Sequence, residues 1–375
     1  MPSALTREQL ARDLAVRDLT DPAQGPHAIQ LLMDAAVHRL AAAWDVDVRR
    51  HRRSPVVDVE DNYDRLRIGQ EAVSRDTRYS RYVDDRRMLR GHTTAMIPPA
   101  LRDLAATGAG DEALLVCPGV VYRRDAIDRL HTGTPHQLDL WRISRLRTVT
   151  TADLDEMIGL LVDELAPGRR WRAEPRAHPY TLEGRQVDFE WHPDEWVEVW
   201  ECGLAHPDVL RGAGLPTGTT GLALGMGLDR LLMLRKDVPD IRLLRSTDPR
   251  VAGQLLDLSP YRPVSAMPPV RRDVSVAVDA ADAAEDLGDR VREALGPDAA
   301  EAVEEVAVLS ETAYDAVPAQ ARARLGLVPG QKNLLVRIVL RPLTRTLTDA
   351  EANAMRDDIY AALHAPLQSG RWPST

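Results

Sequence analysis

The sequence contains little cysteine, lysine and phenylalanine. Its two cysteines, Cys117 and Cys202, form no CxxC or Cys/His spacing, which excludes a disulfide framework and a cysteine-based zinc site. Any metal must therefore be bound by oxygen ligands. Lysine occurs only at Lys236 and Lys332, and Phe189 is the single phenylalanine. Together with abundant alanine, arginine, aspartate, glycine and proline, this imbalance indicates coding bias from a GC-rich genome.

Long apolar runs and an excess of positive charge are also absent. No run approaches the roughly 18 apolar residues that span a bilayer, and the first twelve residues lack a cationic, apolar, small-residue signal pattern. We therefore expect a cytoplasmic protein with no membrane partner. The net charge of -9 argues against binding nucleic acid through a broad basic surface, because such binding rests on phosphate neutralisation. A nucleic-acid partner would need local arginine clusters.

Periodicity and punctuation predict the domain organisation. Helical spacing within residues 5–44 is followed, between residues 113 and 202, by β-rich runs that polar turns separate. This pattern predicts an α+β fold with an antiparallel sheet flanked by helices. Prolines then mark a linker. The expected parts are an N-terminal helical region over 1–50, a main domain over 51–257, a linker over 258–269 and a C-terminal domain over 270–375.

The C-terminal domain has a recognisable order of elements. Its pattern reads as a strand, a helix, two strands and a helix, with a connecting loop that contains some helix over residues 310–330. That order is the split βαβ pattern of a ferredoxin-like α/β sandwich.

An arginine- and histidine-rich hairpin is predicted over residues 120–139. Its first strand ends at Arg123, and its returning strand carries Gln137 and Asp139. ATP needs such an arrangement, because fixed cations must hold the triphosphate while a carboxylate is aimed at the α-phosphorus. The planar fork of an arginine grips two phosphate oxygens at once. The alternative interpretation is an ordinary solvated turn with charges.

A glycine-rich segment over residues 221–233 strengthens the nucleotide interpretation. It reads as an apolar strand, a glycine turn and a helix with Arg230 in its first turn. Gly225 and Gly227 allow the backbone to approach a ligand closely, and Arg230 could hold an outer phosphate. A dinucleotide fingerprint is excluded, because a third glycine and a ribose-binding acid are missing.

These segments resemble signature motifs of the class II aminoacyl-tRNA synthetases, in the version found in phenylalanyl-tRNA synthetases. VYRRDAIDRLHTGTPHQLD is similar to VYRxDxxDxxHxxxFHQxEG, and GLALGMGLDRLLML is similar to GFAFGMGxERLxML. LRGHTT and EVWECGLAHPDVL resemble LRxHTS and EVLGCGMVHPxVL. The last hundred residues, approximately, resemble the ferredoxin-fold anticodon-binding domain of the single-chain organellar enzymes.

The resemblance implies ATP-dependent activation of an amino acid and its transfer to tRNA, with ATP and Mg²⁺ as cofactors and no separate β subunit. Arg123 and Arg230 would be the catalytic cations, and Glu198 would hold Mg²⁺. The implied ATP-binding residues are Arg123, Asp125, His131, Glu198 and Arg230. The implied amino-acid-binding residues are His92, Thr94, Gln137, Asp139, His178, Tyr180, Glu201, Leu222, Ala223 and Leu224.

The side-chain pocket departs from the family pattern. His178-Pro-Tyr180 and the leucines around Ala223 stand where the family has phenylalanines. The loss removes ring contacts worth about 0.5–1.5 kcal/mol per pair, and unpaired buried polar groups cost about 1–3 kcal/mol each. We therefore expect a polar or differently shaped amino acid, unless His178 and Tyr180 point away. Glu201 replaces glycine, and either a basic substrate or a local arginine would pair with it.

Three functions stay open at this point. The first is a single-chain ligase similar to phenylalanyl-tRNA synthetase, as a monomer or a dimer. The second is a paralogue that uses another amino acid or a non-tRNA acceptor, and the third is a catalytically silent RNA-binding protein. An acidic excess in the C-terminal domain disfavours phosphate binding there, although Arg337, Arg341 and Arg345 could form a basic patch.

Overall fold

The computed structural model describes residues 4–75, 80–108, 110–124, 126–264, 267–343 and 345–364. The chain forms two compact units. The first contains residues 1–123 and 134–262, and the second contains residues 124–133 and 263–375.

A seven-stranded sheet forms the centre of the first unit, in the order β1-β5-β6-β10-β9-β8-β7. Among the described residues of this sheet, only the pairing of β1 with β5 is parallel. The expectation of an α+β fold with a largely antiparallel sheet is confirmed. The strands are β1 (Asp47–Arg50), β5 (Glu112–Val120), β6 (His136–Ser144), β7 (Trp171–Pro175), β8 (Thr181–His192), β9 (Glu195–Ala205) and β10 (Thr220–Gly227).

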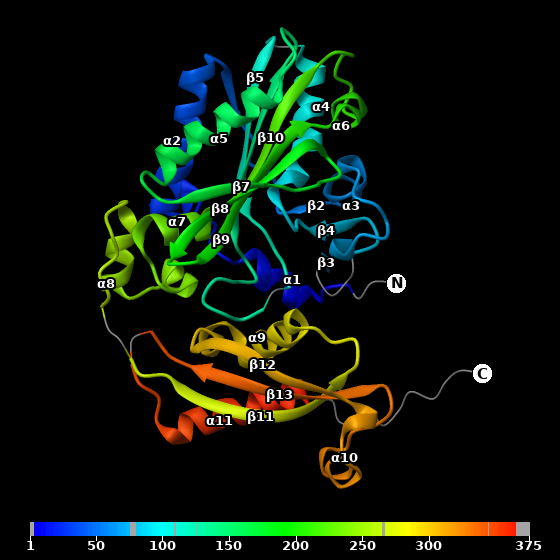
Figure 1. Ribbon diagram of the computed structural model, residues 1–375, viewed down its shortest axis with the longest axis vertical. Coiled ribbons are helices and arrows are strands. Elements are labelled where there is room, and N and C mark those ends of the chain that lie inside the picture. Colours follow the sequence, from blue (N-terminus) through cyan, green and yellow to red (C-terminus); the bar gives the residue numbers. More distant parts are fainter. Residues whose placement is uncertain are drawn as a thin grey trace, which may run out of the picture. The chain divides into compact units, whose positions relative to one another are not determined.

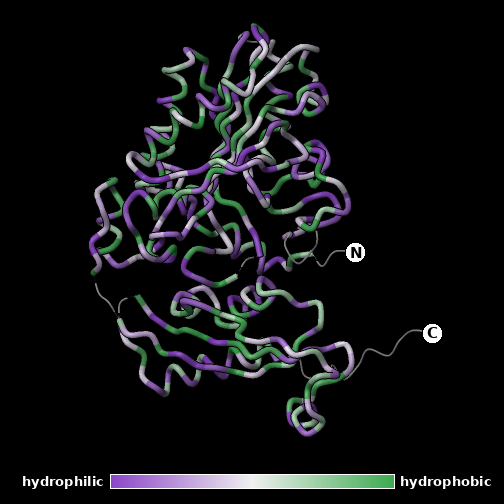
Figure 2. The backbone as a smooth tube through the Cα atoms, viewed as in Figure 1, coloured by the Kyte–Doolittle hydropathy of each residue, from purple (hydrophilic) through white to green (hydrophobic). Residues whose placement is uncertain are grey.

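Helices lie on both sides of this sheet. On one side α2 (Ala28–Trp44) and α5 (Thr151–Leu165) lie next to each other, as Figure 1 shows. Figure 2 shows hydrophobic and hydrophilic residues alternating along these two helices, as expected when one stripe of a helix is buried. On the other side α4 (Ile97–Thr107) packs Leu101 and Leu104 against the strands. The remaining helices are α1 (Arg7–Leu14), α3 (Val59–Asn62), α6 (Pro207–Gly212), α7 (Leu228–Lys236) and α8 (Pro249–Ala252).

A small antiparallel sheet also belongs to the first unit. Its strands are β2 (Val56–Asp58), β4 (Arg87–Leu89) and β3 (Arg81–Tyr82), with β4 in the middle. The strand β4 leads directly into residues 90–96, which contribute to the candidate site.

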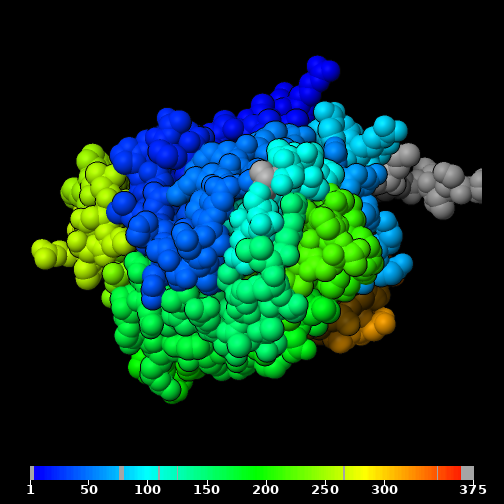
Figure 3. Space-filling model, turned by 90° about the horizontal axis from the view of Figure 1, so that it is seen from above, coloured from blue at the N-terminus to red at the C-terminus, as the bar shows by residue number. Residues whose placement is uncertain are grey.

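The N-terminal region differs from the expected separate part over 1–50. Leu10 of α1 packs in a cluster with Tyr122, at the end of the strand that leads to Arg123. The strand β1 is part of the main sheet. Figure 3 shows the blue N-terminal segment packed against the cyan and green segments of the same unit. Residues 4–50 are therefore structurally part of the first unit.

The second unit contains a three-stranded antiparallel sheet in the order β11-β13-β12. Its elements follow the order strand, helix, strand, strand, helix that the sequence predicts, with a short helix before the last strand. Residues 124–133 join this unit, because Ile127 lies in its hydrophobic core. The elements are β11 (Val270–Asp279), α9 (Ala284–Ala300), β12 (Val303–Ala313), α10 (Ala319–Leu325), β13 (Gln331–Leu340) and α11 (Asp349–Leu363).

The described ranges contain neither a membrane-spanning helix nor a disulfide bond. No helix there combines the length and the apolar content needed to cross a bilayer. Cys117 and Cys202 are both buried free thiols.

The packing of β6 against β10 leads to a stability prediction. A Cβ added at Gly221 would overlap the backbone carbonyl oxygen of Arg142 on the neighbouring strand. We expect Gly221→Ala to lower the free energy of unfolding by about 1–3 kcal/mol, as overpacking does. The matched control is Gly159→Ala in α5, where an added Cβ meets nothing within 4 Å; there we expect a gain of up to about 1 kcal/mol. Urea unfolding measures both, and equal stabilities would contradict the tight strand contact.

Candidate active site

The candidate site lies on one face of three adjacent strands, β6, β10 and β9. Gly225 of β10 is aligned with Asp139 of β6 on one side and with Glu201 of β9 on the other. Directly opposed residues of neighbouring strands project to the same face of a sheet. Because Gly225 has no side chain, it leaves a floor between two carboxylates whose strands lie roughly 9–10 Å apart.

Asp139 is the most buried acid of this face, with 1% exposure. It accepts hydrogen bonds from the hydroxyls of Thr93 (2.6 Å) and Thr94 (3.2 Å) and from the indole of Trp141 (3.2 Å). Burial raises the pKa of Asp139 to about 6, although these hydrogen bonds oppose the rise. No basic side chain of the described ranges pairs with it. A carboxylate in this state suits the ammonium group of an amino acid.

His92 and Gln137 border the same position. The side-chain oxygen of Gln137 accepts a hydrogen bond from the backbone N–H of Thr93 at 3.2 Å. In the described structure neither ring nitrogen of His92 has a hydrogen bond of normal geometry, although the Asn62 backbone influences its pKa. Burial, and then the charge of Arg123, lowers the pKa of His92 to about 3. His92 is therefore a neutral ring whose two nitrogens are buried beside the site.

Arg123 follows β5, and the backbone of a neighbouring loop fixes its side chain. Its Nε donates to the carbonyl oxygen of Gly91 at 2.7 Å. Burial alone would raise the pKa of Glu201, but His178, Arg176 and Arg123 together hold that pKa below its ordinary value. The positive charge of Arg123 thus acts on the acid beside Gly225.

Arg230 lies in the first turn of α7, immediately after β10. Its Nη1 donates to the backbone carbonyl oxygen of Glu198 at 3.3 Å. An irregularity in the pairing of β9 with β8 sets Glu198 opposite Asp188, whereas Glu201 pairs with Gln186. Because Gln186 and Asp188 share one face, the bulge turns Glu198 to the side of Glu201.

Glu198 is exposed and lies close to other acids. Partial desolvation of its carboxyl group raises the pKa, and the neighbouring charge of Glu201 raises it further, while Arg230 and Arg176 oppose the rise. Carboxylates crowded in this way fit a divalent cation. The described residues hold no group of three or more His, Cys, Asp or Glu side chains that could bind a metal by itself. A Mg²⁺ ion at Glu198 would therefore complete its coordination with phosphate oxygens and water.

Stacked rings form one wall of the site. The ring centroids of Trp141 and Tyr180 are 6.2 Å apart, and those of Tyr180 and His178 are 5.6 Å apart. His178 Nε2 lies 2.8 Å from Glu201 Oε2. Because Trp141 and Glu201 belong to the site face, His178 and Tyr180 are directed towards it. The alternative in which these two rings point away is wrong.

The leucines predicted as pocket walls need a correction. Ala223 packs beside Trp141 in the cluster on the site face. Leu222 and Leu224 alternate with Ala223 along the regular strand β10, so they point to the opposite face. Both are almost fully buried there. Of these three predicted residues, the structure brings only Ala223 to the site.

The structure leaves the roles of two predicted ATP contacts untested. Asp125 lies outside the described residues. His131 belongs to the second unit, where its Nδ1 lies 2.7 Å from Asp128 Oδ2. The role of both residues beside ATP stays a prediction.

A buried polar network behind the site was not anticipated. His136 Nε2 accepts a hydrogen bond from the Leu19 backbone at 3.1 Å, so the proton is on Nδ1, which donates to Asp229 at 3.1 Å. Arg245 donates to the Thr134 carbonyl oxygen at 2.7 Å. The network joins the start of β6, which carries Gln137 and Asp139, to the helix turn that carries Arg230. His136 and Asp229 directly precede Gln137 and Arg230 in the sequence, and this position beside predicted site residues could have indicated a supporting role.

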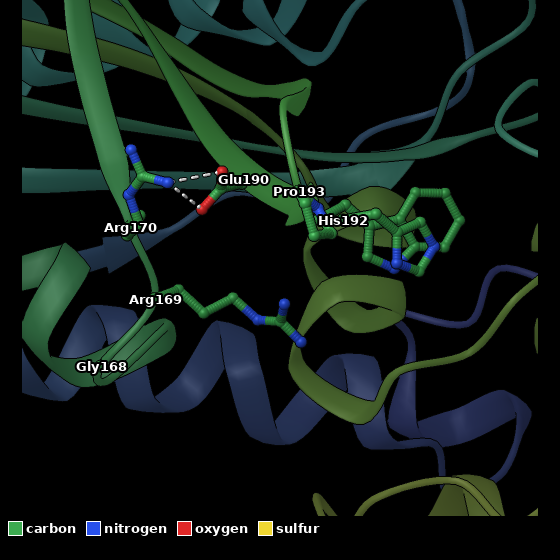
Figure 4. Close-up of a pocket in the computed structure, with 7 residues that line it drawn as sticks. Gly168, Arg169, Arg170, Glu190, His192 and Pro193 are labelled. Atoms are coloured by element: carbon green, nitrogen blue, oxygen red, sulfur yellow. Dashed lines mark hydrogen bonds and ion pairs between the residues drawn. The ribbon is translucent and has the colours of Figure 1, made fainter.

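A surface hollow elsewhere contains none of the predicted site residues. It is lined by Gly168–Arg170 and Glu190–Pro193, and Figure 4 shows the ion pair of Arg170 with Glu190 at its edge. Because Arg170 and Glu190 already neutralise each other, we place the candidate site on the face around Gly225 and not in this hollow.

Comparisons with known proteins identify the family of this chain. The chain is 28% identical over 367 residues to "Probable phenylalanine--tRNA ligase, mitochondrial" of Drosophila melanogaster, covering 82% of this chain and 76% of that protein. It is 29% identical over 333 residues to "Phenylalanine--tRNA ligase, chloroplastic/mitochondrial" of Arabidopsis thaliana, covering 84% and 72%. A phenylalanine--tRNA ligase alpha subunit of Teredinibacter turnerae is 35% identical over 202 residues, covering 51% and 58%. The model of the tRNA synthetase class II core domain (F) matches residues 36–255. The chain belongs to this class II tRNA synthetase family.

Proposed function

We propose that this chain activates phenylalanine, or an amino acid with a related ring, with ATP and transfers it to tRNA. One observation carries the proposal. The charge of Arg123 lowers the pKa of Glu201, and the charge of Glu201 raises the pKa of Glu198. The backbone carbonyl oxygen of Glu198 accepts a hydrogen bond from Arg230. Two guanidinium groups far apart in the sequence thus border one face with a glycine floor. The similar proteins named phenylalanine–tRNA ligases support the same activity.

The amino acid would be oriented by its polar end. Asp139 would accept the ammonium group, with His92, Thr94 and Gln137 around it, and Arg123 would bind the α-carboxylate. This arrangement fixes the nucleophile before the reaction, which removes most of the entropic barrier of a two-substrate step.

The first chemical step needs no general base, because the carboxylate is already ionised. Its oxygen attacks the α-phosphorus of ATP, an O–P bond forms, and the bond to pyrophosphate breaks. Arg123 would stabilise the charge that develops on the α-phosphate, and Arg230 would hold the γ-phosphate of the leaving group. Mg²⁺, held by Glu198 and the phosphates, would supply further charge neutralisation. The terminal ribose of tRNA would then attack the activated carbonyl and release AMP.

We propose that the second unit binds tRNA, as the anticodon-binding domain that it resembles does. Two of its arginines are already paired: Arg337 with Asp273 at 2.8 Å, and Arg341 with Glu304 at 2.6 Å. Phosphates would have to displace these carboxylates, so the contact with tRNA would be local. We also propose that the chain works without a separate β subunit. A cytoplasmic location remains a prediction from the sequence, since the two similar proteins are named for organelles.

Removal of the Arg123 side chain tests the assignment. We expect Arg123→Ala to abolish phenylalanine-dependent ATP–pyrophosphate exchange, because the charge that orients the carboxylate and the α-phosphate is lost. The control is Arg170→Ala, whose side chain is 72% exposed and paired with Glu190. Circular dichroism checks that both variants fold. Exchange near the wild-type level in Arg123→Ala would refute the role of that side chain. Exchange without charging of purified tRNA would favour another acceptor, and no exchange with any amino acid would favour a silent protein.

The raised pKa of Asp139 gives a pH-dependent prediction. The unfolded chain loses this proton near pH 3.8, whereas the folded chain keeps it until about pH 6. The free energy of unfolding therefore falls as the pH rises through this window, by up to about 3 kcal/mol. We expect Asp139→Asn to lack this part of the decrease and to lower exchange at pH 7 by roughly 10–100-fold. Urea unfolding from pH 4 to 7 measures the first effect. If the free energies of unfolding of the two proteins change in parallel with pH, the raised pKa of Asp139 is contradicted.

A further inference from the structure

Glu201 is positioned as a second acid of the amino-acid site. It lies across Gly225 from Asp139, on the same face of the sheet. If Asp139 binds the ammonium group, the charge of Glu201 is not needed for that group. Glu201 also acts electrostatically on Tyr180, which stacks on Trp141 beside Asp139. The second acid therefore borders the ring wall along which a substrate side chain would lie.

The carboxylate of Glu201 is held in a fixed orientation. Oε2 lies 2.8 Å from His178 Nε2, and Oε1 lies 3.4 Å from Arg176 Nε. These two contacts leave acceptor capacity, because a carboxylate offers about four lone-pair positions. The Glu201 side chain keeps 26% exposure. The acid is thus oriented by its neighbours and still open to a ligand.

A purely apolar ring is a poor match for this wall. It would cover an ionised carboxylate and remove water from it without giving a hydrogen bond in return, which is unfavourable. A ring that carries an O–H or N–H group would replace that water with a charge-assisted hydrogen bond. The discrimination therefore has a definite direction, from apolar rings towards rings that donate.

We propose that the site selects an aromatic amino acid whose ring bears a hydrogen-bond donor, and that Glu201, oriented by His178, accepts this hydrogen bond. The inference rests on the proposed function and narrows its substrate class. Glu201 is then a specificity-determining residue, whereas Asp139 and Arg123 recognise the part common to all amino acids. The local pairs with His178 and Arg176 and the contact with a substrate donor use different lone pairs of the same carboxylate.

Amino-acid-dependent ATP–pyrophosphate exchange tests this selection. The substrates are L-phenylalanine, L-tyrosine, L-meta-tyrosine and 4-amino-L-phenylalanine, with kcat/KM measured for each. We expect the wild-type protein to use at least one donor-bearing amino acid better than phenylalanine. In Glu201→Ala, the ratio of kcat/KM for that amino acid to kcat/KM for phenylalanine should fall about tenfold or more, as for a lost hydrogen bond to a charged acceptor. Glu195→Ala, at the start of the same strand, is the matched control and should keep the wild-type ratio.

Thermal unfolding of each variant checks the fold. If Glu201→Ala is unfolded, Glu201→Gln, which keeps the volume and removes the charge, should lower the same ratio by a smaller factor. Phenylalanine activation with an unchanged ratio in a folded variant overturns the inference and leaves the proposed function standing. If the wild-type protein prefers phenylalanine to every donor-bearing analogue, the inference is likewise overturned and the proposed function stands. Absence of exchange with any amino acid overturns the inference and the proposed function together.

Discussion

The alignment of β6, β10 and β9 around Gly225 is the constraint on which the site depends. It sets Asp139 and Glu201 on the same face, about two strand spacings apart. A slip of one residue between β6 and β10 would turn Asp139 and the ring of Trp141 to the opposite face, and a slip between β9 and β10 would do the same to Glu201. The floor, the ammonium-binding acid and the second acid are thus consequences of one register, which the regular hydrogen-bonded pairing of these strands maintains.

The charges of the site are held by backbone and by one another. Arg123 is fixed by the carbonyl oxygen of Gly91, and Arg230 by that of Glu198. A backbone carbonyl partner orients a guanidinium group without neutralising its charge. The opposite situation holds on the second unit, where carboxylates already pair with Arg337 and Arg341.

The buried hydrogen bonds of His136 connect segments that are distant in the sequence. His136, the first residue of β6, bonds to Asp229 in the first turn of α7, and the backbone N–H of Leu19 in the N-terminal segment donates to the other ring nitrogen of His136. The family model begins at residue 36, so this N-terminal contact lies outside the part of the chain that the model matches. The segment before residue 36 thus helps to orient His136, which precedes the site residues of β6.

The sequence by itself determined the fold class, the order of elements in the second unit and the family, because hydrophobic periodicity and ordered motifs are local properties. It also identified Arg123, Glu198, Arg230 and Asp139 as candidates. Only the tertiary structure decided that Leu222 and Leu224 face away from the site, that Glu198 shares a face with Glu201, and that His178 orients that acid. These relations depend on strand register and on a bulge, which arise from pairing between segments distant in the chain and leave no mark in the spacing of residues along it.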